Sequence, residues 1–92
     1  MESHEFTLHI QHFHEEFNID DSPEGRAKKL LEEHTEFRQA LEYGTKEQQD
    51  DEAVDVLVCS WSNCIARGIH NPFFAGYLKL ELTRRKYREA KL

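Results

Sequence analysis

The sequence contains no apolar run long enough to cross a membrane and no excess of basic residues. Its 12 lysines and arginines are outnumbered by 18 aspartates and glutamates, which gives a net charge of −6 with histidine neutral. This balance disfavours general binding to nucleic acid or to an acidic membrane surface. Residues 1–5 are polar and acidic, which is not the pattern of a signal peptide.

Cysteine is scarce as well, because only Cys59 and Cys64 are present in 92 residues. Five positions apart in one helical pattern, their side chains diverge by about 140°, so we expect no disulfide between them. Free thiols are typical of a reducing compartment, and we therefore expect a cytoplasmic protein.

Hydrophobic periodicity predicts a single all-α domain over residues 1–92, built as a four-helix bundle around a helical hairpin. The first helix covers residues 4–17. Its aromatic and aliphatic stripe is expected to pack in the core; the stripe consists of Phe6, Ile10, Phe13 and Phe17. Four histidines decorate the helix: His4, His9, His12 and His14. His9 and His12 share a face but lack a third metal ligand, so we interpret them as a polar face.

Helix start and stop signals predict two further helices that follow each other in the sequence with only a short turn between them. Ser22 can cap a helix that begins at Pro23 and runs to about residue 43, where Gly44 is expected in the left-handed stop position. Thr45 and Gln48 form a capping box that opens the third helix, which runs to about residue 67. The chain therefore folds back on itself as a hairpin.

The apolar stripes of these two helices differ in width. The stripe of the second helix contains Ala27, Leu30, Leu31, His34, Phe37 and Leu41. The stripe of the third contains Val54, Val58, Trp61 and Ile65 and is widened by Ala53, Val56, Leu57 and Cys64. One neighbouring helix cannot cover so broad a face, which predicts burial in an oligomer. Small residues on the remaining arc, Cys59, Ser62 and Ala66, leave room for a ligand.

Two pairs of carboxylates face each other across the predicted hairpin. Glu33 and Glu36 on one helix, and Glu52 and Asp55 on the other, are each spaced i, i+3, so each pair projects from one side of its helix. Both pairs lie roughly 11–17 Å from the turn. Four carboxylates at one level repel each other, and a divalent cation offsets that repulsion. Oxygen-only ligands favour Mg²⁺, Mn²⁺ or Ca²⁺.

A fourth helix is expected to begin at Pro72 after an Asn71 cap. Its first half is apolar, and its second half carries the one basic cluster of the chain: Lys79, Arg84, Arg85, Lys86, Arg88 and Lys91. Lys79, Thr83 and Lys86 share a face. A basic face on a helix is by default solvated, but beside a carboxylate site it suits phosphate binding.

Glu32-Glu33-x-x-Glu36, followed after fifteen residues by Glu52-x-x-Asp55, resembles the EExxE…ExxD signature of the MazG-like, all-α nucleoside triphosphate pyrophosphohydrolases. The continuation Val56-Leu57, the segment Arg67-Gly68-Ile69 and the last helix from Lys79 to Tyr87 are also similar to that family. The resemblance spans roughly residues 10–88. One position departs from the pattern, because Thr83 stands where the family has asparagine.

This resemblance implies a function and a role for each matching residue. Glu33, Glu36, Glu52 and Asp55 match Mg²⁺ ligands, and Glu32 matches an acidic position that holds or activates water. The implied substrate-binding positions are Lys79, Thr83, Arg84, Lys86 and Tyr87, of which Lys79 and either Lys86 or Arg84 would hold the outer phosphates. The implied reaction is hydrolysis of a (deoxy)nucleoside triphosphate to nucleoside monophosphate and pyrophosphate. The implied assembly is a homodimer or a dimer of dimers in which helices of two subunits complete each pocket.

Alternative functions remain open at the level of sequence. A di-iron carboxylate bundle requires Glu-x-x-His motifs, which the chain lacks. No serine, cysteine or histidine arrangement for nucleophilic catalysis is evident, which favours direct attack by water. A catalytically degenerate helical interaction module of the same fold, and a relative that acts on phosphoribosyl-ATP, are the two alternatives to the nucleoside triphosphate reading.

Overall fold

The structure, a computed structural model, describes residues 1–91 as four α-helices without a strand. In chain order the helices are α1 (Ser3–Glu16), α2 (Pro23–Tyr43), α3 (Lys46–Ala66) and α4 (Pro72–Ala90). The expected all-α class is therefore confirmed for these residues, and Leu92 lies outside them. None of the described helices combines the length and the apolar character needed to cross a membrane.

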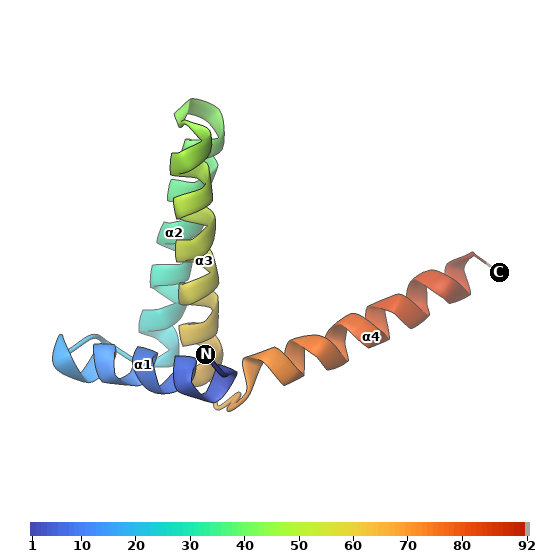
Figure 1. The fold of residues 1–92 in the computed structure, drawn as a ribbon, viewed down its shortest axis with the longest axis horizontal. Coiled ribbons are helices and arrows are strands. Elements are labelled where there is room, and N and C mark those ends of the chain that lie inside the picture. Colours follow the sequence, from blue (N-terminus) through green and yellow to red (C-terminus); the bar gives the residue numbers. More distant parts are fainter. Residues whose placement is uncertain (92) are drawn as a thin grey trace.

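The α2–α3 hairpin is the centre of the molecule, and its two helices run side by side along their whole length (Figure 1). The predicted caps form. The Ser22 hydroxyl accepts a hydrogen bond from the backbone N–H of Gly25 at 3.0 Å. The Thr45 hydroxyl accepts from the Gln48 N–H at 3.2 Å, and the Gln48 side chain accepts from the Thr45 N–H at 2.9 Å. These bonds satisfy backbone donors that helix ends leave free and define where each helix begins.

Gly44 joins the two helices, but not in the expected left-handed conformation. Its φ of −92° and ψ of 165° are extended. The expectation was wrong because Thr45 caps the next helix at once, which requires the chain to leave α2 in an extended path. Glycine is needed here for space, since a Cβ would lie 2.8 Å from the Ala40 carbonyl oxygen. The left-handed glycine is instead Gly68 at the end of α3, with a φ of 82°.

Helix α1 lies across the base of the hairpin, close to the C-terminal end of α3 (Figure 1). Trp61 on α3 holds it by donating a hydrogen bond from Nε1 to the Thr7 hydroxyl at 2.9 Å. The same indole packs edge-on against the Phe6 ring, with centroids 4.9 Å apart. Trp61 is therefore an anchor between two helices, in a geometry that aromatic pairs prefer.

Helix α4 projects away from the other three helices and contacts α3 only near the connecting turn (Figure 1). The radius of gyration is 15.6 Å, whereas a compact domain of this length has about 12 Å. The accessible surface is 7419 Å², against roughly 5,600 Å² for a compact monomer of this mass. One chain therefore leaves much of its surface uncovered.

Half of the residues in the predicted apolar stripes are exposed on that uncovered surface. Ile10, at 6% exposure, is the one hydrophobic residue among the described residues that is buried. Phe13 and Phe17 of the α1 stripe are exposed, as are Leu31 and Leu41 of α2. His34, expected inside the α2 stripe, is exposed as well. These core assignments are wrong for the single chain, because neither α4 nor any other helix packs over them.

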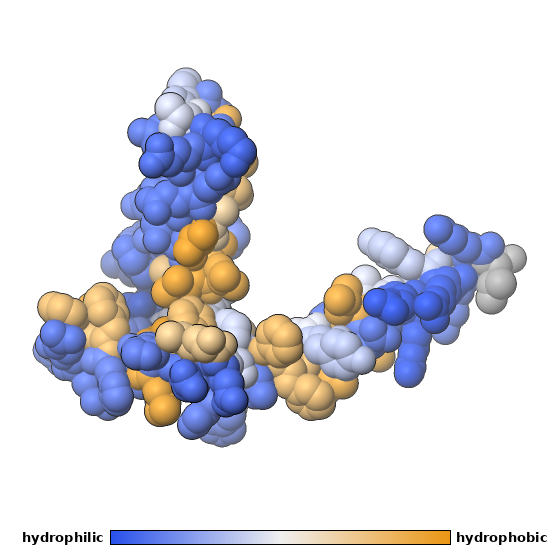
Figure 2. All heavy atoms as spheres, viewed as in Figure 1, coloured by the Kyte–Doolittle hydropathy of each residue, from blue (hydrophilic) through white to orange (hydrophobic). Residues whose placement is uncertain are grey.

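Exposed apolar residues of α3 and of the beginning of α4 form a surface that we call the open face. It consists of Val54, Leu57, Val58, Phe73, Phe74, Tyr77 and Leu78, all exposed. Figure 2 shows apolar side chains along α3 and at the beginning of α4, around the angle between the two helices. Large exposed apolar patches on a water-exposed protein mark interaction surfaces.

Candidate metal centre

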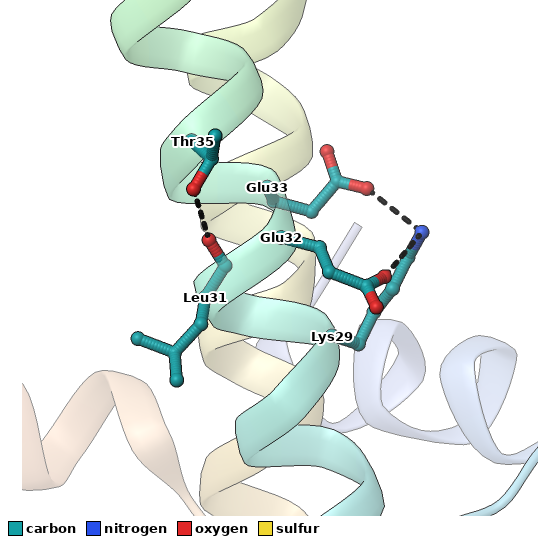
Figure 3. Close-up of polar contacts among 5 residues, drawn as sticks. All are labelled: Lys29, Leu31, Glu32, Glu33 and Thr35. Atoms are coloured by element: carbon teal, nitrogen blue, oxygen red, sulfur yellow. Dashed lines mark hydrogen bonds and ion pairs between the residues drawn. The ribbon is translucent and has the colours of Figure 1, made fainter.

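The α2 side of the site is built around Glu33, whose side chain is only 8% exposed. Lys29, one turn earlier, places its Nζ atom 3.0 Å from a Glu33 oxygen and 3.9 Å from a Glu32 oxygen. In Figure 3 these three side chains extend from one side of α2, whereas Leu31 points from the other. The i, i+4 spacing of Lys29 and Glu33 brings the charges together on one helix.

Three carboxylates meet across the hairpin at this level. Each of Glu33, Glu36 and Glu52 offers an oxygen within 4.8 Å of the other two. Glu33 and Glu36 come from adjacent turns of α2, and Glu52 comes from the facing turn of α3. The hairpin therefore brings together residues that are up to nineteen positions apart, as their distances from the turn predict.

Asp55 lies beside this group without joining the three. Burial raises the pKa of the Asp55 carboxyl above its usual value, and the charge of Glu33 adds to the rise. Glu32 also stays outside the group; its side chain is 52% exposed and turns toward Lys29. The charges of four of the five predicted acidic site residues thus repel one another, while Glu32 lies at the rim.

Burial and mutual repulsion both raise the pKa values of carboxyls in the cluster. The charge of Glu33 raises the pKa of the Glu36 carboxyl. Burial raises the pKa of Glu52, and the charges of Glu36 and Asp55 raise it further. Among the described residues, Lys29 forms an ion pair with the cluster, through Glu33. The hydrogen bond to Glu33 is also the main reason why the pKa of Lys29 is raised. One ammonium group cannot balance several carboxylates.

Two oxygens of the cluster are buried without any hydrogen-bond partner: Glu33 Oε2 and Glu52 Oε2. A buried carboxylate oxygen without a partner is costly, and most buried polar atoms in proteins are paired. Both orphaned oxygens belong to the carboxylates that converge across the hairpin. Hard oxygen donors of this kind, converging from two helices, fit a divalent cation such as Mg²⁺.

The predicted substrate-binding residues do not reach this cluster within one chain. Lys79, Thr83, Arg84, Lys86 and Tyr87 all lie on α4, which points away from the hairpin (Figure 1). The Thr83 hydroxyl donates to the Lys79 carbonyl oxygen at 3.0 Å. Arg84 pairs with Glu81 at 3.5 Å. The carboxylates are thus brought together by the fold of the chain, and the basic residues are not.

Sequence reasoning missed a buried polar pair between α1 and α3. The Ser62 hydroxyl lies 3.0 Å from Nε2 of His14, and the two residues are 3% and 9% exposed. Burial, followed by the charge of Arg26, lowers the pKa of His14, so the imidazole stays neutral. Because the two residues are 48 positions apart, no local sequence motif predicts the contact between them. The small residues predicted to leave room on α3 were its one signal.

This pair forms part of the wall of a cavity of about 620 Å³ between α1, α2 and α3. Cys59, also predicted to leave room for a ligand, lines it as well. Both cysteines are free thiols, as their spacing predicts. Burial raises the pKa of the Cys59 thiol, which keeps it protonated and unreactive.

Comparison of the chain with protein-family models, with curated proteins and with solved structures gave no match.

Proposed function

We propose that this protein is a Mg²⁺-dependent nucleoside triphosphate pyrophosphohydrolase of the MazG-like type. The observation that carries the proposal is the group of Glu33, Glu36 and Glu52, whose oxygens lie within 4.8 Å of one another. Two of these oxygens are buried and unpartnered. A carboxylate cluster of this kind binds a cation that in turn binds phosphate oxygens, which is the usual arrangement in phosphoryl-transfer sites.

Glu33, Glu36, Glu52 and Asp55 would hold Mg²⁺, or Mn²⁺ in its place. The bound ion supplies positive charge that orients the triphosphate and offsets charge developing on its oxygens. Glu32, at the rim and 52% exposed, holds the attacking water and takes up its proton. The water oxygen attaches to the α-phosphorus as the bond from that phosphorus to the bridging oxygen breaks. The products are a nucleoside monophosphate and pyrophosphate.

The outer phosphates require cations, and within the chain α4 points those residues away from the cluster (Figure 1). We therefore propose a homodimer or a dimer of dimers in which basic residues of one copy bind the outer phosphates of a nucleotide at the carboxylate cluster of a second copy. These residues are Lys79, Arg84 and Lys86. The open face supports this assembly. The excess of exposed surface over a compact monomer is comparable to what stable dimers bury. Assembly would also complete the four-helix bundle that one chain leaves open.

The free thiols and the acidic surface agree with a cytoplasmic enzyme that acts on a small nucleotide and not on nucleic acid. The test is pyrophosphate release from a panel of ribo- and deoxynucleoside triphosphates, with Mg²⁺ and with EDTA. We expect stoichiometric pyrophosphate and nucleoside monophosphate only when Mg²⁺ is present. Release of orthophosphate would contradict the proposed bond cleavage, and no turnover of any nucleotide would contradict the enzyme.

Mg²⁺ is expected to stabilise the protein, and more strongly at pH 8 than at pH 5. The pKa values of Glu36, Glu52 and Asp55 are raised in the folded state. Folding therefore takes up protons, and metal-free stability falls as the pH rises through those pKa values. At pH 8 these carboxyls have lost their protons, and a bound cation would offset the repulsion between the resulting carboxylates. Saturating Mg²⁺ should raise Tm by roughly 10 °C or more at pH 8.

Thermal unfolding at both pH values, with Mg²⁺ and with EDTA, measures this effect. His14 acts in the opposite direction, because its lowered pKa makes stability fall on acidification below the ordinary histidine value. That contribution is the same with and without Mg²⁺, so the difference between the two melting curves isolates the cluster. Equal Tm values at pH 8 would contradict a metal centre.

The open face also favours a second function, that of a helical module that binds another protein through α3 and α4. Such a module has no need of a metal at Glu33, Glu36 and Glu52. The pH 8 melting experiment distinguishes the two functions, because only the enzyme requires Mg²⁺-dependent stabilisation.

A further inference from the structure

The cavity of about 620 Å³ where α1, α2 and α3 meet is lined by none of the carboxylates of the cluster. We propose that it binds the base of the nucleoside triphosphate, with Phe13 against the ring and the His14–Ser62 pair at its edge. The proposal rests on the proposed function, because it assigns the part of the substrate that the carboxylate cluster does not hold. The volume lies within the roughly 300–1,000 Å³ range of small-molecule sites.

The cavity lies beside the carboxylate cluster, where the base would be if the phosphates of the same nucleotide bind at the carboxylates. Lys29 lines the cavity and also pairs with Glu33 of the cluster at 3.0 Å. Cys59 lines it from α3, and after burial the charge of Glu33 is the next cause of the raised pKa of the Cys59 thiol. The cavity therefore adjoins the cluster at Lys29, which Figure 3 shows beside Glu33. A nucleotide with phosphates at the carboxylates would extend its sugar past Lys29 and place its base in the cavity.

The walls suit a flat aromatic ligand. Ile10 and Phe13 of α1 and Val58 of α3 supply apolar surface to the cavity. The Phe13 side chain is 53% exposed although it belongs to the apolar stripe of α1. Its ring rests on Phe17, with centroids 5.0 Å apart. Bases bind in protein pockets by stacking on aromatic and apolar side chains, and a supported, accessible ring is ready to receive one.

The polar groups suit an edge that both donates and accepts hydrogen bonds. A hydroxyl offers one donor and two acceptor sites, and a neutral imidazole offers one of each. The single bond between Ser62 and His14 leaves part of that capacity unused. Both side chains are held in place by burial, at 3% and 9% exposure. Fixed buried polar groups discriminate strongly, because a ligand that cannot pair with them leaves them unsatisfied.

A second cavity, of about 440 Å³, lies on another side of the same pair and is a weaker choice for the base. Its lining includes the acidic side chains Glu15 and Asp21. It is lined neither by Lys29, which links the larger cavity to the cluster, nor by a phenylalanine, tyrosine or tryptophan ring on which a base could stack.

The test compares two products that are not hydrolysed further, a nucleoside monophosphate and pyrophosphate, by calorimetric titration with Mg²⁺ present. Cys59→Phe places a ring in the cavity. Cys64→Phe adds the same ring at the other part-buried cysteine of α3, which lines none of the described cavities. We expect Cys59→Phe to weaken binding of the tightest monophosphate at least tenfold and to leave pyrophosphate binding within twofold. Cys64→Phe should change neither.

Unchanged monophosphate binding by Cys59→Phe would overturn the proposal, and so would an equal loss for pyrophosphate. Pyrophosphate release from nucleoside triphosphates by the unmodified protein is measured in parallel. Hydrolysis together with unchanged monophosphate binding overturns the base site alone, whereas absence of hydrolysis overturns the proposed function.

Ser62→Ala provides a second test that does not depend on tolerance of a larger side chain, with Ser60→Ala on the same helix as the control. Losing one hydrogen bond should weaken the preferred monophosphate about three- to tenfold. It should also change the order of preference among adenine, guanine, cytosine and uracil monophosphates, while pyrophosphate binding stays the same. An unchanged order, with affinities equal to those of Ser60→Ala, would overturn the role of the His14–Ser62 pair.

Discussion

Glu36→Gln is expected to abolish Mg²⁺-dependent pyrophosphate release while leaving the protein folded. Glu36 is exposed at its helix surface but contributes one of the three oxygens that lie within 4.8 Å of one another. Glutamine keeps the size of the side chain and removes the charge that binds the cation. Changes to residues that only orient metal ligands already cost roughly 10–100-fold, so loss of a ligand should lower kcat/KM by at least about 100-fold.

The same substitution should raise Tm in EDTA, because it removes one of the repelling carboxylates. The pKa of Glu36 is raised by Glu33, which means that its ionised form opposes folding when no metal is bound. The variant thus gains metal-free stability and loses activity, a combination that damage to the fold cannot produce. Glu42→Gln, also exposed on α2 but outside the cluster, is the control and should change neither property. Full activity of Glu36→Gln would rule out the proposed metal centre.

Leu57→Glu is expected to convert an oligomer of the 10.9 kDa chain into a monomer. Leu57 lies in the open face and is 55% exposed in the single chain, so a glutamate there can keep its charge in water as long as the chain is monomeric. In a dimer with two-fold symmetry it would place a charge in the interface from both subunits. Loss of a buried leucine costs roughly 1.5–3 kcal/mol per side chain. Two copies therefore weaken association by at least about 100-fold.

Sedimentation equilibrium measures the mass, and pyrophosphate release measures the consequence for activity. The monomer should be inactive even though its carboxylates are intact, because the basic residues of α4 would then have no partner cluster. His12→Glu adds the same charge at an exposed position on α1 and should leave mass and activity as they are. A Leu57→Glu variant with unchanged mass would exclude the open face as the interface. An unmodified chain that is monomeric at high concentration would exclude the assembly.

Local signals predicted the helices well, because a helix end is decided by a few neighbouring residues. Ser22, Thr45 and Asn71 were expected to cap α2, α3 and α4, and each accepts a hydrogen bond from a backbone N–H at its helix start. The facing carboxylates followed from the same signals. Once the turn at Gly44 is known, the rise per residue sets Glu33 and Glu36 opposite Glu52. Local chemistry thus sufficed for the acidic half of the site.

Side-chain burial was predicted less well, because burial depends on which elements pack together. Helical periodicity placed Leu31, Phe13 and His34 on apolar stripes, but it does not say whether another helix covers the stripe. In the chain itself α4 turns away, and these residues remain exposed. The conformation of Gly44 was misjudged for a related reason. A glycine after a helix is commonly left-handed, but the immediate start of α3 imposes an extended path.

The sequence by itself determined the four helices, their caps, the hairpin and the level at which its carboxylates meet, because each depends on contacts within a few residues or on the constant rise of a helix. Only the tertiary structure decided that Glu33 and Glu52 each bury an unpartnered oxygen, that His14 meets Ser62 beside a cavity, and that α4 carries its basic residues away from the cluster (Figure 1). Those features depend on the angles at which α1 and α4 leave the hairpin. Such angles arise from packing between segments distant in sequence, which no local pattern records.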